Sequence, residues 1–133
     1  MINRVEKLSL LSEMIAFAKN EKRIKRVEYK FLLGVAKQLS VSREDFDYLI
    51  ENPVHHVHLK SHSERIVQFH RLVLLMSIDG EITEKEIYKL HNFGLRMGLN
   101  HDCINTVLYL MESFPNKIVP PDVLIDVFKV QYN

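Results

Sequence analysis

The sequence predicts an all-α protein, a compact bundle of about seven helices. Apolar residues recur at spacings of three and four along most of its 133 residues, which is the period of an amphipathic α-helix. Glycine and proline number only 4 each, and most of them stand where a helix is expected to begin or end. No run of strand length alternates apolar and polar residues, so we expect no β-sheet.

The first half of the chain is expected to form three helices. Apolar stripes run through residues 5–18 and 27–39 at helical spacing. Ser42, followed by Asp45, is typical of an N-cap that opens a short third helix, and the Asn52-Pro53 pair ends it. The two stripes comprise Val5, Leu8, Leu11, Ile15 and Ala18, and then Val27, Phe31, Val35 and Leu39.

A fourth helix follows an irregular connection over residues 52–59, which have no convincing period. Ser61 and Glu64 match a capping box, in which Glu stands three residues after the capping Ser. Apolar residues cover nearly every side of the helix between Glu64 and Met76. We therefore expect this helix to be the central and most buried element.

The fifth helix is marked at both ends. Thr83 and Glu86 form a second capping box, and Ile87 begins the apolar stripe that follows. Gly98 is expected to close this helix in the left-handed conformation.

Two further helices complete the chain. Asn100 is expected to cap the sixth helix and Pro115 to end it. Pro120-Pro121 opens the last helix, over about residues 121–131, because proline is tolerated in a first helical turn.

An internal repeat is the most informative pattern in the chain. An offset of 58 residues aligns residues 8–50 with residues 66–108 without a gap, so helices and turns follow in the same order in both halves. We interpret the halves as a duplicated unit with pseudo-two-fold symmetry inside a single domain that spans residues 1–133. The alternative is the chance agreement that any helical sequence shows at some offset. The aligned pairs are Ile24 with Ile82, Glu28 with Glu86, Leu32 with Leu90, Leu39 with Met97, Val41 with Leu99, Phe46 with Ile104 and Leu49 with Val107.

Composition and charge argue against several classes of protein. The chain is 47% hydrophobic and its charge balances to +1, so we expect a soluble protein with no nucleic acid as partner. Cys103 is the only cysteine, which excludes an intrachain disulfide and favours a reducing, cytoplasmic location. The longest apolar run, Leu72–Met76, is too short to span a membrane, and the first residues lack the apolar stretch of a signal peptide.

Residues 78–86 carry a resemblance to a known family. The stretch Ile78-Asp79-Gly80-Glu81-Ile82-Thr83-Glu84-Lys85-Glu86 places Asp-Gly, an aliphatic residue, a capping hydroxyl and Glu between two apolar helices. Together with the duplicated unit, it makes the chain resemble the tellurite-resistance TerB-like family from about Leu8 to Leu110. The resemblance implies an all-helical domain with a helix–DG–helix unit in each half. It also implies clustered acidic side chains that hold a divalent cation such as calcium.

Four acidic residues match the pattern that the resemblance implies. Asp79 and Glu86 match it in the second half, and Glu28 matches it in the first half. Glu21 stands where Asp is usual in the family, and Lys22 replaces the Gly. The positive side chains around the first-half turn oppose the binding of another cation, so this turn is less suited to a metal site than the second-half turn.

A purely structural role is the alternative for the second-half motif. Asp79-Gly80 can form the turn, since glycine adopts positive φ readily. Thr83 can then cap the following helix while the Glu86 carboxylate accepts a hydrogen bond from the amide of the cap.

The chain offers two other groups of candidate site residues. A basic run that includes Lys22, Arg23, Lys25 and Arg26 could bind a phosphate or an acidic partner, and the alternative is a solvated helix junction. The cluster His55 to His62 contains four histidines, which could hold zinc but fit no standard zinc module, so a polar loop is the better interpretation. The four are His55, His56, His58 and His62.

Two residues with reactive side chains are expected to be structural. His70 lies on the apolar fourth helix, where a core histidine is more usual than a catalytic one. Cys103 lies in a first helical turn, which can lower the pKa of a thiol, but no cysteine-enzyme signature accompanies it.

The sequence therefore favours a non-enzymatic, cytoplasmic interaction module. The resemblance ties such a module to a stress-related or membrane-associated assembly, with a protein partner that the sequence does not identify. The alternative is a divalent-metal binding or sensing domain that uses Asp79, Glu86, Glu28 and Glu21 to hold a cation such as calcium. A metal-dependent hydrolase is the least favoured, because no nucleophile or base accompanies these acids.

Overall fold

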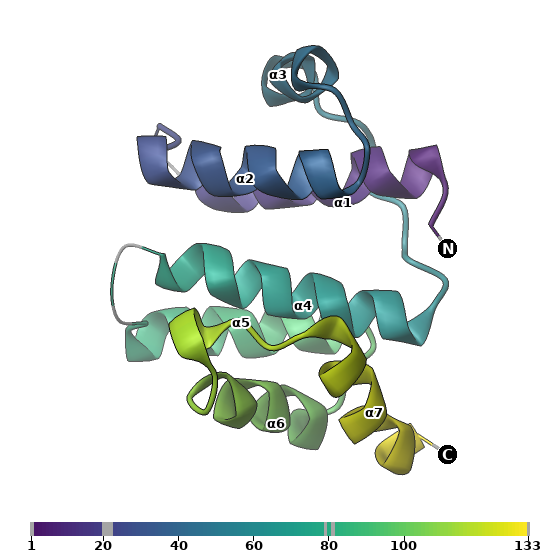
Figure 1. Cartoon of the computed structure of the whole chain (residues 1–133), viewed down its shortest axis with the longest axis vertical. Coiled ribbons are helices and arrows are strands. Elements are labelled where there is room, and N and C mark those ends of the chain that lie inside the picture. Colours follow the sequence, from purple (N-terminus) through teal and green to yellow (C-terminus); the bar gives the residue numbers. More distant parts are fainter. Residues whose placement is uncertain (1, 20–22, 79, 81, 133) are drawn as a thin grey trace. The chain divides into compact units, whose positions relative to one another are not determined.

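The computed structural model describes residues 2–19, 23–78, 80 and 82–132, of which 127–132 are described by their backbone alone. These residues form seven α-helices, one 3-10 turn and no β-strand, which confirms the predicted fold class (Figure 1). The helices are α1 (Arg4–Lys19), α2 (Arg26–Gln38), α3 (Arg43–Glu51), α4 (His62–Ser77), α5 (Glu84–Arg96), α6 (His101–Met111) and α7 (Pro121–Tyr132), and the 3-10 turn η1 (Pro115–Lys117) precedes α7.

The chain divides into two compact units, Met1–Leu59 with α1 to α3 and Lys60–Asn133 with α4 to α7. Each unit has buried apolar residues on all of its first three helices. The interpretation of residues 1–133 as a single domain stays a prediction.

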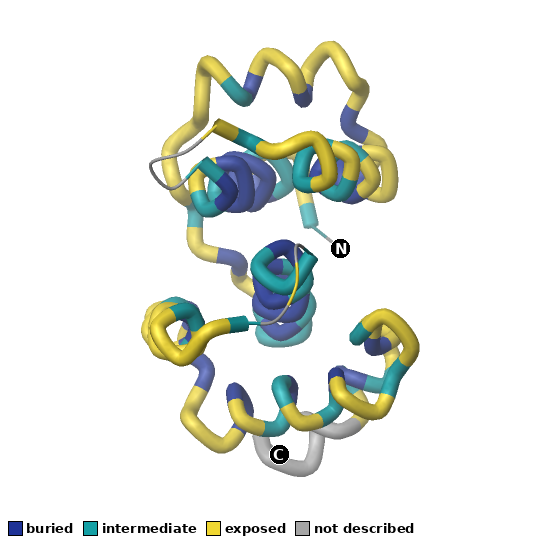
Figure 2. Tube along the Cα trace, turned by 90° about the vertical axis from the view of Figure 1, so that its left-hand side faces the viewer, coloured by how far each residue is buried: buried dark blue, intermediate teal, exposed yellow. Residues whose placement is uncertain are grey.

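In the first unit, α1 and α2 lie side by side and α3 runs across them, so each helix packs against the other two (Figures 1 and 2). Leu11, Leu32 and Phe46, one from each helix, have no exposed surface. The ring of Tyr29 on α2 lies 5.5 Å from that of Phe46, centroid to centroid. An aromatic pair at this distance adds to the burial of apolar surface in holding α3 on α2.

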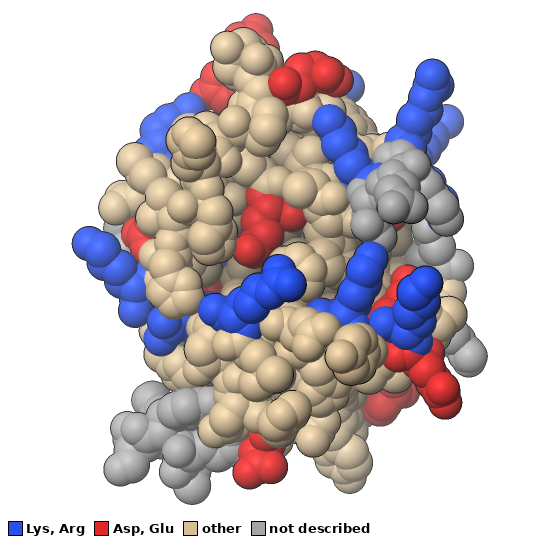
Figure 3. All heavy atoms as spheres, turned by 180° about the vertical axis from the view of Figure 1, so that it is seen from behind, with Lys and Arg blue, Asp and Glu red and all other residues tan. Residues whose placement is uncertain are grey.

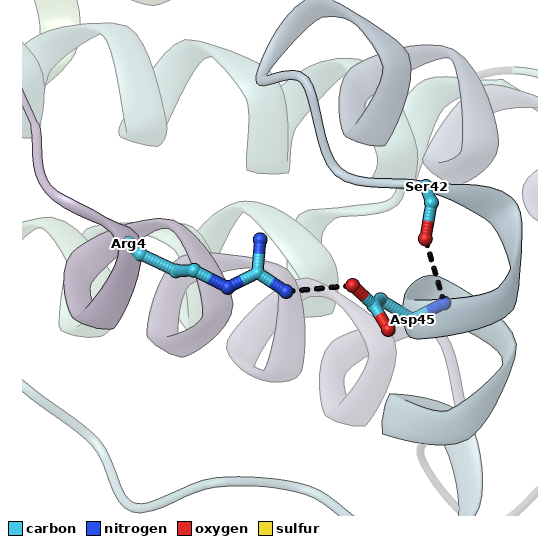
Figure 4. Close-up of polar contacts among 3 residues, drawn as sticks. All are labelled: Arg4, Ser42 and Asp45. Atoms are coloured by element: carbon cyan, nitrogen blue, oxygen red, sulfur yellow. Dashed lines mark hydrogen bonds and ion pairs between the residues drawn. The ribbon is translucent and has the colours of Figure 1, made fainter.

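Polar contacts also hold α3 against α1. The Arg4 guanidinium of α1 lies 2.6 Å from the Asp45 carboxylate in the first turn of α3 (Figure 4). Both side chains are about half exposed, so solvent screens this pair and its contribution to stability is small. Ser42 caps α3, because its hydroxyl accepts a hydrogen bond of 3.1 Å from the Asp45 amide.

The connection after α3 is irregular, as predicted, but serines of α1 hold it in place. The Ser9 hydroxyl accepts a 2.7 Å hydrogen bond from the Val57 amide, and the Ser12 hydroxyl accepts one of 3.2 Å from the Val54 amide. Both serines are buried, so these bonds satisfy backbone donors that would otherwise be unpaired.

In the second unit, α4 lies between α5 and α7, and α6 packs against both α5 and α7 (Figure 2). Phe69 of α4, Leu90 of α5, Ile104 of α6 and Leu124 of α7 have no exposed surface. This unit therefore uses a fourth helix, α7, that has no counterpart in the first unit.

Helix boundaries recur at the predicted offset of 58 residues. The first residues of α4, α5 and α6 follow those of α1, α2 and α3 by that number, and α4 and α5 also end at the matching positions. The turn after the second helix of each unit is closed in the same way: Ser40 has a φ of 60° and Gly98 a φ of 84°. The pseudo-two-fold relation of the two halves in space stays a prediction.

Burial corrects the expectation that α4 alone is the central helix. Seven residues of α4 are buried, but so are eight residues of α1, its counterpart in the first unit. The apolar pattern of α1 understates its burial, because several of its buried residues are polar: Glu6, Ser9 and Ser12. Each unit therefore has its own buried first helix.

Three residues assigned to apolar stripes are exposed. Val5 is 61% exposed, Val27 41% and Ile87 36%. All three lie in the first turn of their helices. A 3.6-residue period identifies the buried face of a helix, but it does not tell where along the helix a neighbour begins to cover that face.

Two helical glycines predict opposite effects of the same substitution. A Cβ atom added at Gly94 of α5 would lie 2.5 Å from Cδ1 of Ile104 and 3.2 Å from Cε1 of Phe69, whereas one added at Gly34 of α2 meets nothing within 4 Å. Gly94→Ala is therefore expected to destabilise the protein by about 1–3 kcal/mol through overpacking. Gly34→Ala should stabilise it by about 0.5–1 kcal/mol, because alanine is the better helix former.

Urea unfolding of the two variants and the parent protein measures both effects. Equal and small changes in the two variants would contradict the close packing of α5 on α6 and α4.

Candidate functional site

The turn before α5 is a complete capping box. The Thr83 hydroxyl accepts a hydrogen bond of 3.2 Å from the Glu86 amide, and a Glu86 carboxylate oxygen accepts one of 2.9 Å from the Thr83 amide. The same oxygen lies 3.0 Å from the Thr83 hydroxyl. Gly80 has a φ of 144°, a conformation that favours glycine. These contacts agree with the structural alternative for Glu86, since its carboxylate is engaged by the cap.

The matching turn before α2 holds half of this motif. The Glu28 carboxylate accepts a hydrogen bond of 2.9 Å from the Lys25 amide. Lys25 occupies the cap position, but an ammonium group has no acceptor for the amide of Glu28. The first-half turn therefore keeps the acidic member of the box and lacks the hydroxyl.

The predicted cation site is only partly described. Glu86 belongs to the second unit and Glu28 to the first, whereas Asp79 and Glu21 lie outside the described residues. Within the described part of the chain, no group of three or more His, Cys, Asp or Glu side chains is placed to hold a metal ion. A site that includes Asp79 and Glu21 stays a prediction.

The basic run is exposed where it is described. Arg23, Lys25 and Arg26 are exposed, and Lys22 lies outside the described residues. Lys19, at the end of α1, donates a hydrogen bond of 2.6 Å from its ammonium to the Ile50 carbonyl in the last turn of α3. A cation at a helix C-terminus is favourable, so this lysine has a structural role.

The histidine cluster is divided between the two units. His55, His56 and His58 are exposed on the connection after α3, whereas His62 begins α4 in the second unit. His56 Nδ1 lies 3.7 Å from a carboxylate oxygen of Glu13 on α1. Burial, together with the charge of Arg65, lowers the pKa of His62.

His70 anchors the segment between α6 and α7. Its ring is buried, and Nε2 accepts a hydrogen bond of 3.1 Å from the Val119 amide. The same Nε2 lies 3.2 Å from the Lys117 carbonyl oxygen, which can only accept a hydrogen bond, whereas the Val119 amide can only donate one. A neutral ring with its proton on Nδ1 makes the bond to Val119, and one with its proton on Nε2 makes the bond to Lys117. Asn116 and Lys117 both have positive φ, at 57° and 62°, so the chain before Val119 bends sharply. Burial lowers the pKa of His70.

Cys103 is fully buried, and its amide donates a hydrogen bond of 2.8 Å to the side chain of Asn100, the cap of α6. The thiol therefore lies in the core of the second unit and is not accessible as a surface nucleophile.

The outer face of α5 is a feature that the sequence analysis missed. Tyr88 is 70% exposed and Leu95 is 44% exposed, seven residues apart on one side of the helix. Lys85, Lys89 and Arg96 are also exposed. A signal was present in the sequence, because the same register of α2 carries Lys30 and Lys37 in place of Tyr88 and Leu95.

No family model, curated protein or solved structure matches the chain. The resemblance to the TerB-like family therefore stays a prediction that rests on residues 78–86 and the repeat. Among the helices of the described residues, none combines the length and the apolar character needed to cross a membrane.

The two caps predict a reciprocal pair of substitutions. Thr83→Ala removes an acceptor and is expected to destabilise the protein by about 1 kcal/mol. Lys25→Thr supplies the missing acceptor in α2 and should stabilise it by about the same amount. Thermal unfolding of both variants measures these shifts, and a stabilising effect of Thr83→Ala would contradict the cap geometry.

Glu86→Gln divides the capping role from the cation role. Glutamine serves nearly as well as glutamate in a capping box, so the free energy of unfolding should fall by only a few tenths of a kcal/mol. If the protein binds calcium through Glu86, millimolar calcium raises the melting temperature of the parent and not of this variant. We expect little calcium response in either protein, and a calcium-dependent rise that Glu86→Gln abolishes would establish the cation site instead.

His70 predicts a loss of stability in mild acid. Because its pKa is lowered from the ordinary value of 6.5 in the folded protein, the unfolded chain binds the proton more readily. The contribution of His70 to stability is then full above pH 6.5 and is lost as the pH falls toward the lower, folded-state pKa. Thermal melts between pH 7.5 and pH 5 should show a shallower decline for His70→Gln than for the parent. The exposed His55→Gln is the matched control, and an unchanged decline in His70→Gln would overturn this assignment.

Proposed function

We propose that the protein is a non-enzymatic interaction module that binds a partner protein on a helical surface. The observation that carries the proposal is the exposure of large side chains on the outer faces of packed helices. Tyr48 of α3 is 66% exposed, Tyr88 of α5 is 70% and Tyr109 of α6 is 76%. Tyrosine is enriched among the residues that contribute most to protein–protein binding, because its ring is large and rigid and its hydroxyl can form hydrogen bonds.

Single exposed apolar residues are ordinary, so their arrangement matters more than their number. On α5, Tyr88 and Leu95 lie two turns apart on the same side of one helix. The caps at Thr83 and Asn100 hold the first turns of α5 and α6, so this side-chain pair is presented on a helix whose start and following turn are fixed by hydrogen bonds. A rigid surface loses little conformational entropy on binding.

The proposed setting is the cytoplasm, in a stress-related assembly, as the TerB-like resemblance implies. The buried thiol of Cys103 is compatible with a reducing compartment.

Isolation and reconstitution of a native partner test the proposal. The full chain is used as bait in cells that express it, and each captured protein is purified and titrated against the chain by calorimetry. The proposal predicts a saturable complex with at least one protein. If no captured protein binds the purified chain, the proposed function is wrong.

A further inference from the structure

We propose that the outer face of α5 binds an acidic amphipathic helix of a partner protein. This inference rests on the proposed function and assigns to it a surface and a partner chemistry. We define the α5 face by its exposed residues Lys85, Tyr88, Lys89, Asn92, Leu95 and Arg96.

The apolar part of the α5 face is a line along the helix axis. Leu90 and Gly94 face the core of the unit and are buried. Tyr88 and Leu95 project from the opposite side, about 10 Å apart along the axis at 1.5 Å per residue. Exposed Asn92 lies between them along the axis, so the line is one side chain wide and contains two apolar side chains.

Cations border this line on one side. At 3.6 residues per turn, Lys85, Lys89 and Arg96 project beside Tyr88 and Leu95. The Arg96 guanidinium is 5.7 Å from the centroid of the Phe93 ring, which keeps it on this edge. The α5 helix is behind α4 in Figure 1 and faces the reader in Figure 3, where Lys and Arg side chains lie among uncharged surface and some Asp and Glu side chains.

Glu84 and a histidine pair border the other side of the line. Glu84 is exposed and lies one turn before Tyr88, so this edge carries one negative charge at the start of the helix. The ring of His91 on α5 lies 5.7 Å from that of His101, the first residue of α6, centroid to centroid. The surface on the histidine side therefore extends from α5 onto the start of α6. The positive charge lies on the other side, with Lys85, Lys89 and Arg96.

The first unit supplies an internal comparison. Its helix α2 has the same length as α5, and its fifth and twelfth residues are Lys30 and Lys37, both exposed. Exposed lysines at these positions are hydrated by solvent and give no reason to expect a partner on this side of α2. On α5 the same positions hold Tyr88 and Leu95. The three cations of the α5 face also have uncharged counterparts on α2, which are Val27, Phe31 and Gln38.

The charges of the α5 face indicate which kind of partner segment it can bind. Three cations on one edge of the line outnumber the single carboxylate of Glu84 on the other, so the face fits a helix that presents leucine-like residues at the same spacing with carboxylates on the side of the cations. A lipid surface is a poorer match, because an interfacial helix buries a broad apolar face and this line is narrow. The partner segment is therefore expected to be acidic and amphipathic.

The test uses a synthetic helical probe and the full chain. The probe is a fluorescein-labelled peptide with leucine at spacings of three and four and glutamate at most other positions. A second peptide replaces every glutamate by lysine and is the charge-reversed control. Fluorescence anisotropy at physiological salt should show saturable binding of the glutamate peptide and none of the lysine peptide.

The matched variants transfer the α2 residues to α5. In Tyr88→Lys/Leu95→Lys, we expect the affinity for the glutamate peptide to fall about tenfold or more. Added lysines would strengthen a purely electrostatic attraction, so this loss is specific to apolar docking. Lys30→Ala/Lys37→Ala on α2 should leave the affinity unchanged. Circular dichroism and thermal melting establish that each variant is folded.

A second variant keeps the test decisive if the first does not fold. Lys89→Gln/Arg96→Gln removes two cations and should weaken binding and reduce its dependence on salt. Unchanged affinity in a folded α5 variant overturns the proposal. So does equal binding of the lysine peptide, or binding to phosphatidylserine vesicles and not to the peptide.

The native partner separates this inference from the proposed function. If the partner binds Tyr88→Lys/Leu95→Lys as tightly as the parent chain, the α5 face is the wrong surface and the interaction function stands. If no protein binds the parent chain, the proposed function itself fails.

Discussion

The close approach of α5 to its neighbours is the constraint on which the second unit depends. Because Gly94 has no side chain, Ile104 of α6 occupies the space where a Cβ atom would stand, and Phe69 of α4 lies in tight contact with that position. This contact, with the buried Leu90, fixes which side of α5 faces the core. The opposite side of α5 is therefore exposed to solvent, and Tyr88 and Leu95 project from it.

Local signals accounted for the helix boundaries. The caps at Ser42, Ser61, Thr83 and Asn100 each accept the expected backbone hydrogen bond, because capping depends on residues only three positions apart. The offset of 58 residues likewise follows from turns and caps that are local in sequence.

Contacts between distant residues could not be predicted in this way. His70 accepts a hydrogen bond from Val119, and Ser9 accepts one from Val57, across more than 45 residues in each case. Nothing in the neighbouring sequence marks these partners. The candidate site shows the same division. The role of Glu86 follows from the local capping box, whereas the α5 face could be identified only from the exposure of side chains such as Tyr88 in the folded protein.

Three surfaces are candidates for binding a partner: the α5 face, the basic residues Arg23 to Arg26, and the turn before Thr83. Mapping the partner's contact surface by NMR chemical-shift perturbation on the full chain tests directly which of them binds. The account predicts perturbations concentrated on the α5 face and its edge with α6. Perturbations centred on Arg23 to Arg26 or on the turn before Thr83, with the α5 face unchanged, would contradict it.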